Sequence, residues 1–261
     1  METTFFALLA VFVVSLVSLI GVAALALNAT RLGSIVRILV ALAAGALLAD
    51  AFVHLIPESL EVIGDGFLFG VAALAGVSSF FILERYLRWH HAHHGPETEH
   101  SGHEKFESGP SHAHVAPLVL VADGIHNMID GAVIAASFLL SPSLGVATTV
   151  AVFLHEIPQE IADYALLIHA GYSRRAALLW NFLSGLTALL GAGFVLYIGS
   201  DVPLFAAYAG AVTAGAFIYL AAADLIPELH KSEGVASSIT AVFAFLVGVG
   251  IMLSLTLLES H

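Results

Sequence analysis

The stretch from residue 144 to residue 170, LGVATTVAVFLHEIPQEIADYALLIHA, is long enough to cross a bilayer as a helix, yet its second half is charged. A membrane-spanning helix needs about 20 mainly apolar residues, and a carboxylate at mid-membrane costs about 2.5 to 3.5 kcal/mol. Within this stretch, LHEIPQEIAD (154–163) places a histidine, two glutamates and an aspartate around Pro158. The pattern predicts an ion-binding site inside a membrane-spanning helix.

The composition of the whole chain indicates an integral membrane protein in contact with the lipid bilayer. Of 261 residues, 59% are hydrophobic and only 11% are charged, and the mean hydropathy is +0.96. The chain has no cysteine, which excludes disulfides, thiolate metal sites and cysteine nucleophiles. Both lysines, Lys105 and Lys231, lie in polar stretches, so an intramembrane retinal Schiff base is excluded as well. We expect no nucleic-acid partner.

Polar and turn-forming clusters divide the chain into eight runs long enough to span a membrane, within a single transmembrane domain over 1–261. The expected spans are 4–27, 34–58, 66–88, 116–140, 144–170, 173–199, 203–229 and 234–258. The first run is too long for a cleaved signal peptide, so we interpret it as a helix. The one long connection, 89–115, is polar, and we expect it to be disordered without a ligand. It contains His90, His91, His93, His94, His100, His103, His112 and His114.

The basic residues predict the orientation, because Lys and Arg are retained on the cytoplasmic side of a membrane. All eight of them lie in or beside the first, third, fifth and seventh connections. We therefore expect both termini outside the cytoplasm and the histidine-rich loop inside it, in a plasma or inner membrane.

A short internal repeat suggests how the spans are arranged. The sequence Leu-Ile-Pro-Glu closes the second span at 55–58 and the seventh at 225–228, at opposite faces in this topology. The expected fold is therefore an all-α membrane protein with eight helices in a 3+2+3 arrangement, in which helices 1–3 and 6–8 form an inverted repeat.

The fourth and fifth spans carry most of the intramembrane polar side chains. They are Asp123, His126, Asn127 and Asp130 on the fourth, and His155, Glu156, Gln159, Glu160 and Asp163 on the fifth. Offsets of three, four and seven place each set largely on one helix face. No Lys or Arg lies within these spans, so a divalent cation, or protons in its absence, is the simplest means of neutralising the acids. Imidazole and carboxylate suit Zn²⁺ and related ions.

At these residues the chain resembles the ZIP family (Zrt- and Irt-like proteins) of zinc and iron transporters. His126-Asn127-Met128-Ile129-Asp130-Gly131 resembles the family's HNxxDG, and His155-Glu156-Ile157-Pro158-Gln159-Glu160 resembles its HEIPHE, in the subfamily with a histidine-rich cytoplasmic loop. The resemblance covers essentially the whole chain.

The resemblance implies import of a divalent metal through a binuclear site between helices 4 and 5, by an elevator-like motion. By motif position, the implied metal ligands are His126, Asn127, Asp130, His155, Glu156, Gln159 and Glu160. Gln159 departs from the family pattern, because that place is usually His or Glu. A neutral amide there weakens one of the two metal positions or alters selectivity, and Glu160, one position away, would face differently. Zinc is the expected cargo, with Cd²⁺, Fe²⁺ and Mn²⁺ as alternatives. We expect no catalytic cofactor, and a homodimer.

Further residues lie where an ion could enter or leave. His54 and Glu58 could form a relay at the outer end of the second span, and Asp224, Glu228 and His230 a relay at the inner end of the seventh. Asp123, Asp163 and Asn181 are further candidates for the pathway.

Other functions remain open. The chain could be an exporter or a proton-coupled carrier of another solute. A zinc-dependent intramembrane hydrolase is less favoured, because Glu160 replaces the second histidine of the HExxH signature. We therefore do not expect an enzyme.

Overall fold

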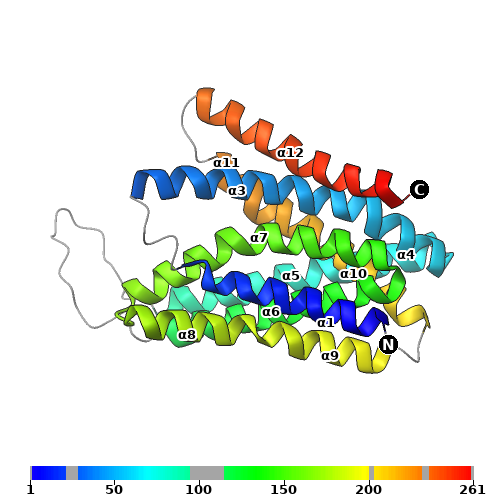
Figure 1. Cartoon of the computed structure of the whole chain (residues 1–261), viewed down its shortest axis with the longest axis horizontal. Helices are drawn as coiled ribbons and strands as arrows, with labels where there is room; N and C mark the ends of the chain where they lie inside the picture. The colour runs from blue at the N-terminus through cyan, green and yellow to red at the C-terminus, as the bar shows by residue number, and fades with distance from the viewer. Residues whose placement is uncertain (1, 22–28, 95–114, 200–202, 231–234, 260–261) are drawn as a thin grey trace.

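The computed structural model describes residues 2–21, 29–94, 115–199, 203–230 and 235–259, and all its regular elements are helices, as the sequence predicts (Figure 1). The elements are α1 (Glu2–Ser15), η1 (Leu16–Leu19), α3 (Ala29–Asp50), η2 (Ala51–Leu55), α4 (Ile56–Ile63), α5 (Gly66–His94), α6 (Val115–Leu140), α7 (Pro142–His169), α8 (Arg174–Gly185), α9 (Thr187–Gly199), α10 (Pro203–Tyr219), η4 (Leu220–Leu225), α11 (Ile226–His230) and α12 (Val235–Glu259).

Five segments of the described chain are long and apolar enough to cross a membrane. They are Glu2–Leu19, Leu32–Ile63, Arg174–Gly199, Leu204–Ala223 and Ala236–Thr256. Helix α5 contributes a shorter apolar segment, Gly66–Ile82. Helices α6 and α7 are not among these five segments, and they carry the acidic residues of the predicted ion site. The chain is therefore a multi-pass membrane protein, and eight spans remain a prediction.

Local sequence explains where several helices begin and end. Ser141 caps α7 by accepting a hydrogen bond from the Leu144 amide at 3.1 Å, and Pro142 follows it at the first helical position. Gly64 ends α4 with a φ of 68°, a conformation that favours glycine, and Asp65 then accepts hydrogen bonds from two amides at the start of α5.

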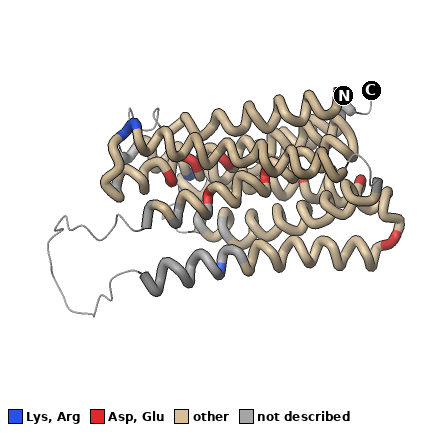
Figure 2. Tube along the Cα trace, turned by 90° about the horizontal axis from the view of Figure 1, so that it is seen from below, with Lys and Arg blue, Asp and Glu red and all other residues tan. Residues whose placement is uncertain are grey.

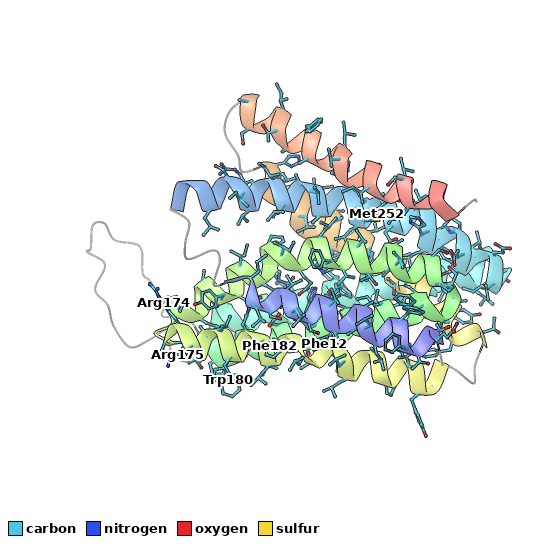
Figure 3. The ribbon with its side chains drawn as sticks, viewed as in Figure 1. Phe12, Arg174, Arg175, Trp180, Phe182 and Met252 are labelled. Carbon is cyan, nitrogen blue, oxygen red and sulfur yellow. The ribbon has the colours of Figure 1, made fainter. Side chains whose placement is uncertain are left out.

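Both termini lie at the same end of the bundle (Figure 1). Arg174 and Arg175, at the start of α8, lie at the other end, and Trp180 points outward from the same helix (Figure 3). This separation agrees with the charge distribution that predicts the topology.

Glycines allow two helix pairs to approach closely, and the two contacts repeat each other. A β-carbon at Gly45 of α3 would lie 2.1 Å from the Phe245 carbonyl oxygen of α12, and one at Gly248 would lie 2.1 Å from the Leu42 oxygen. Helices α5 and α10 meet in the same way, with Gly76 against the Val212 oxygen and Gly215 against the Ala73 oxygen, each at 1.9 Å. Gly45 and Gly215 each precede a Leu-Ile-Pro-Glu sequence by ten residues. The similarity between the second and seventh spans, predicted from Leu-Ile-Pro-Glu, thus extends to the glycine contacts that each makes with a neighbouring helix.

The same reciprocal contact joins α6 to α9. Gly131 approaches the Ala188 carbonyl oxygen and Gly191 approaches the Met128 carbonyl oxygen, with β-carbon distances of 1.9 and 1.8 Å. Any side chain at these positions would push the two helices apart, so α6 and α9 pack as one unit.

A π-helical turn precedes each Leu-Ile-Pro-Glu proline. In η2 the Ile56 amide donates to the Ala51 carbonyl, and in η4 the Ile226 amide donates to the Ala221 carbonyl. Proline cannot donate the next hydrogen bond, so the ladder shifts register just before it. Such turns are common at functional sites.

One helix boundary differs from the prediction, and some of the predicted runs are not continuous α-helices. Helix α5 extends past residue 88 to His94, so the start of the expected loop is helical; residues 95–114 lie outside the described chain. The sixth run is interrupted at Leu186 between α8 and α9, and the seventh contains the turn η4, so neither is one uninterrupted α-helix.

Candidate metal centre

Four side chains from α6 and α7 meet in the interior of the bundle. His126 and Asp130 come from α6, and His155 and Glu156 come from α7. One nitrogen or oxygen of each lies within 4.8 Å of all the others. His126 is 13% exposed and the other three are at most 3% exposed, so the group is nearly closed to solvent. Figure 2 shows acidic positions along the middle of the helices.

The spacing of these atoms matches the ligand sphere of a small divalent ion. His155 Nε2 lies 3.0 Å from Asp130 Oδ2 and 3.4 Å from Glu156 Oε1. His126 Nε2 lies 3.4 Å from Glu156 Oε1 and 3.7 Å from Asp130 Oδ2. Ligands about 2.0 to 2.1 Å from a tetrahedral zinc ion lie about 3.3 Å from one another. These four distances are close to the separation between zinc ligands, and no two of the ligand atoms are more than 4.8 Å apart.

The hydrogen bonding of His155 leaves one ring nitrogen facing this centre. Its Nδ1 lies 3.3 Å from the Ala151 carbonyl oxygen, which can only accept, so Nδ1 carries the proton of that hydrogen bond. In the neutral ring, Nε2 then presents a lone pair to the Asp130 carboxylate at 3.0 Å. Two lone pairs at that distance repel unless a cation, either a proton or a metal ion, lies between them. Metal-binding histidines are usually oriented by such a hydrogen bond from the other ring nitrogen to a carbonyl oxygen.

Two further atoms at this centre are buried and make no hydrogen bond to a described residue, although they lie 3.4 Å from each other. They are His126 Nε2 and Glu156 Oε1. Buried polar atoms are normally paired, and leaving one unpaired costs about 1 to 3 kcal/mol. No described arginine side chain supplies a charge here, because Arg37, Arg85, Arg174 and Arg175 are all exposed. A bound cation would satisfy both atoms.

A second polar cluster lies beside the first, between α6, α7 and α8. Asp123 accepts hydrogen bonds from Asn127 at 2.9 Å and from Ser184. Glu160 Oε2 accepts one from Asn181 at 2.5 Å, and Asn181 also donates to the Ser18 carbonyl at 3.1 Å. This arrangement ties α6 and α7, the two helices of the candidate centre, to α8 and η1.

The predicted ligands thus divide between two places. Glu160 faces Asn181 rather than the four-residue centre, as expected from its position one residue beyond Gln159. Asn127 pairs with Asp123, while Gln159 and Asp163 are partly buried. The pathway residue Asn181 is fully buried and contacts Glu160 directly.

The residues of the predicted outer relay contact other helices. His54 Nε2 lies 3.0 Å from Thr256 Oγ1, and Glu58 accepts a hydrogen bond from Ser141 at 3.1 Å. His230 is exposed at the end of α11. The side chains of Asp224 and Glu228 lie outside the described part of the structure.

Asp50 was not predicted as a functional residue, although it is fully buried. Its Oδ2 accepts a hydrogen bond from Thr148 at 3.0 Å, and its Oδ1 lies 3.3 Å from His54 Nδ1. An acid inside an apolar run, four residues before a histidine, is the sequence signal that could have identified it.

Comparison with known families agrees with this geometry. The family model described as ZIP Zinc transporter matches residues 1–115 and 89–256, nearly the whole chain. The chain belongs to the ZIP zinc transporter family. Resemblance at the two central motifs is therefore confirmed at the level of the family.

Several ZIP proteins are similar to this chain. Human "Zinc transporter ZIP10" is 36% identical over 185 residues, which cover 66% of this chain and 22% of that protein. "Zinc transporter zipt-7.1" of Caenorhabditis briggsae is 31% identical over 291 residues, covering 87% of this chain and 72% of that protein. Bovine "Metal cation symporter ZIP14" is 36% identical over 155 residues, covering 56% and 31%. The chain thus spans only a fraction of the mammalian relatives.

Proposed function

We propose that this protein transports divalent metal ions, zinc first among them, across a membrane. The observation that carries the proposal is the set of four atoms from His126, Asp130, His155 and Glu156. Four of their separations lie between 3.0 and 3.7 Å, and none of the described arginines is buried beside them. The printed names of the relatives, zinc transporters and a metal cation symporter, support the same function.

The metal would bind between α6 and α7, which would be the fourth and fifth of eight membrane-spanning helices. The repeated contacts of α3 with α12 and of α10 with α5 support the 3+2+3 arrangement. Its inner pair would then be α6 and α7, where the candidate ligands lie. One metal is expected at the four-residue centre; a second would have to use Gln159, Asn127 or Glu160, which do not belong to that group.

An elevator-type alternation would move α1 and α6 to α9 against α3, α5, α10 and α12. The glycine contacts support this division, because each joins two helices of the same group: α6 to α9, α3 to α12, and α5 to α10. Movement would then occur at interfaces where no such contact fixes the helices. The charge distribution favours an orientation with both termini outside and the histidine-rich loop inside. Import into the cytosol follows from the family resemblance, and we retain the homodimer as part of the proposal.

Metal uptake into proteoliposomes tests this function. The wild-type protein should carry Zn²⁺ or Cd²⁺ into vesicles loaded with a metal-sensitive dye. Asp130→Ala and Glu156→Ala should abolish the uptake, whereas Glu61→Gln, a substitution of an exposed acid on α4, should leave it unchanged. Uptake that persists in both Ala variants would overturn the proposed site, and absence of uptake in the wild type would favour a carrier of another solute.

A further inference from the structure

Four side chains away from the metal centre form a continuous polar chain across three helices. Thr148 of α7 donates to Asp50 of α3, and Asp50 faces His54 of η2 at 3.3 Å. His54 in turn meets Thr256 of α12 at 3.0 Å. Asp50 and Thr148 are fully buried and His54 is 2% exposed. This group, the Asp50–His54 network, therefore has its charges shielded from water.

The network offers too few strong ligands for a metal ion. Asp50 and His54 supply one carboxylate and one imidazole, and the remaining members are hydroxyl groups, which are weaker ligands than His, Asp or Glu. A proton does fit. An ionised Asp50 beside a neutral His54 leaves one net negative charge in a medium of low dielectric constant, and a proton on His54 cancels it.

The hydroxyl of Thr256 can pair with His54 both when the ring is protonated and when it is neutral. Thr256 Oγ1 has one hydrogen and two neighbours that can accept it, His54 Nε2 at 3.0 Å and the Met252 carbonyl at 3.3 Å. When His54 is neutral with Nδ1 protonated, Thr256 donates to Nε2. When His54 is an imidazolium, Thr256 accepts from Nε2 and donates to Met252. Both states keep the contacts of the ring with Asp50 and Thr256 satisfied.

The network is also placed to respond to metal. Thr148 and His155 lie seven residues apart on α7, which puts them on one face about 10 Å apart along the helix. Helix α7 thus carries both a ligand of the candidate centre and the residue that contacts Asp50. A divalent cation at that centre repels a proton on His54, because both are positive in a medium that screens charge poorly.

We propose that Asp50 and His54 form a proton-binding site, separate from the metal centre, which releases its proton when metal binds. The proton leaves the His54 imidazolium for water, and the ring remains neutral. Glu58, one turn beyond His54, is partly buried and accepts a hydrogen bond from Ser141. Helix α10, which also packs on η2, carries Tyr208 and Tyr219 as its titratable residues, and the ring of Tyr219 packs against Phe81. Helices α7 and α12 contribute hydroxyl groups.

Cadmium titration of the full-length protein in detergent, in weakly buffered solution with a pH indicator, tests the inference. The wild type should release about one proton more per bound Cd²⁺ than Asp50→Asn. Asp65→Asn, which changes an exposed acid at the start of α5, should match the wild type. Equal proton release from the wild type and Asp50→Asn would overturn the proton site while leaving metal binding intact. Absence of Cd²⁺ binding in the wild type would refute the metal centre instead.

Nitrogen NMR of histidine rings gives a second readout that does not require the Asp50 variant to fold. The signal lost in His54→Gln identifies His54. In the wild type at neutral pH this ring should carry protons on both nitrogens without metal and on one nitrogen with Cd²⁺. A ring that stays neutral, or stays charged, in both conditions would contradict the proposal.

Discussion

Substituting Gly191 by alanine should separate α9 from α6, and the structure gives the size of the conflict. The added β-carbon would lie 1.8 Å from the Met128 carbonyl oxygen, whereas ordinary contact begins at 3.4 Å, so the helices would have to part by about 1.6 Å. Overpacking of this kind costs about 1 to 3 kcal/mol. For a chain of this size, that cost lowers Tm by roughly 2 to 12 °C.

Gly193→Ala on the same helix provides the matched control. A β-carbon at Gly193 meets nothing within 4 Å, while the gain in helix propensity is the same at both positions. Thermal unfolding of the two variants in detergent should therefore place Gly191→Ala below Gly193→Ala by the steric cost alone. Equal Tm values would show that α6 and α9 are not held at this distance, and would remove the argument that they move as one unit.

Three further changes probe the polar residues. His155→Ala should weaken Cd²⁺ binding by more than the roughly 10- to 100-fold that losing an outer-shell partner costs, as measured by isothermal titration; affinity within tenfold of the wild type would contradict its role as a ligand. Gln159→Glu should raise the number of Cd²⁺ ions bound per chain from one to two, because it restores a charged group at the position where the family has His or Glu. An unchanged stoichiometry would show that the second metal position is lost for another reason. Asn181→Leu should destabilise the protein by about 1 to 3 kcal/mol, because it leaves Glu160 Oε2 buried without its hydrogen-bond donor. In thermal unfolding, the double variant Asn181→Leu, Glu160→Leu should recover part of that lost stability, and no recovery would refute the pairing of the two residues.

The central helices were predictable because their limits are set by local chemistry. The expected span 116–140 corresponds to α6, Val115–Leu140, and 144–170 corresponds to α7, Pro142–His169. Between them stand Ser141 and Pro142, an N-cap and a first-position proline that terminate one helix and start the next. The grouping of candidate ligands was predictable for a similar reason, since offsets of three and four place His126 and Asp130 on one face of a helix.

The features missed depend on contacts between distant segments. Helical periodicity places Asp50 inside an apolar run, but only the packing of α3 against α7 brings it to Thr148. The interruption at Leu186 likewise has no proline to indicate it. The repeated Leu-Ile-Pro-Glu indicated that two spans are related. The glycine contacts that these spans share are made with carbonyl oxygens of other helices, so the sequence of one span does not show them. Glu160 shows how fine the distinction is, because one position along α7 directs its carboxylate to Asn181 instead of the centre.

Anomalous diffraction from crystals soaked in Zn²⁺ or Cd²⁺ tests most directly whether α6 and α7 hold a divalent ion. The account predicts a peak between these helices with His126, Asp130, His155 and Glu156 as its ligands, and no peak in crystals of Asp130→Ala. A metal-soaked crystal in which that position is empty, while the same ion occupies other sites, would contradict it.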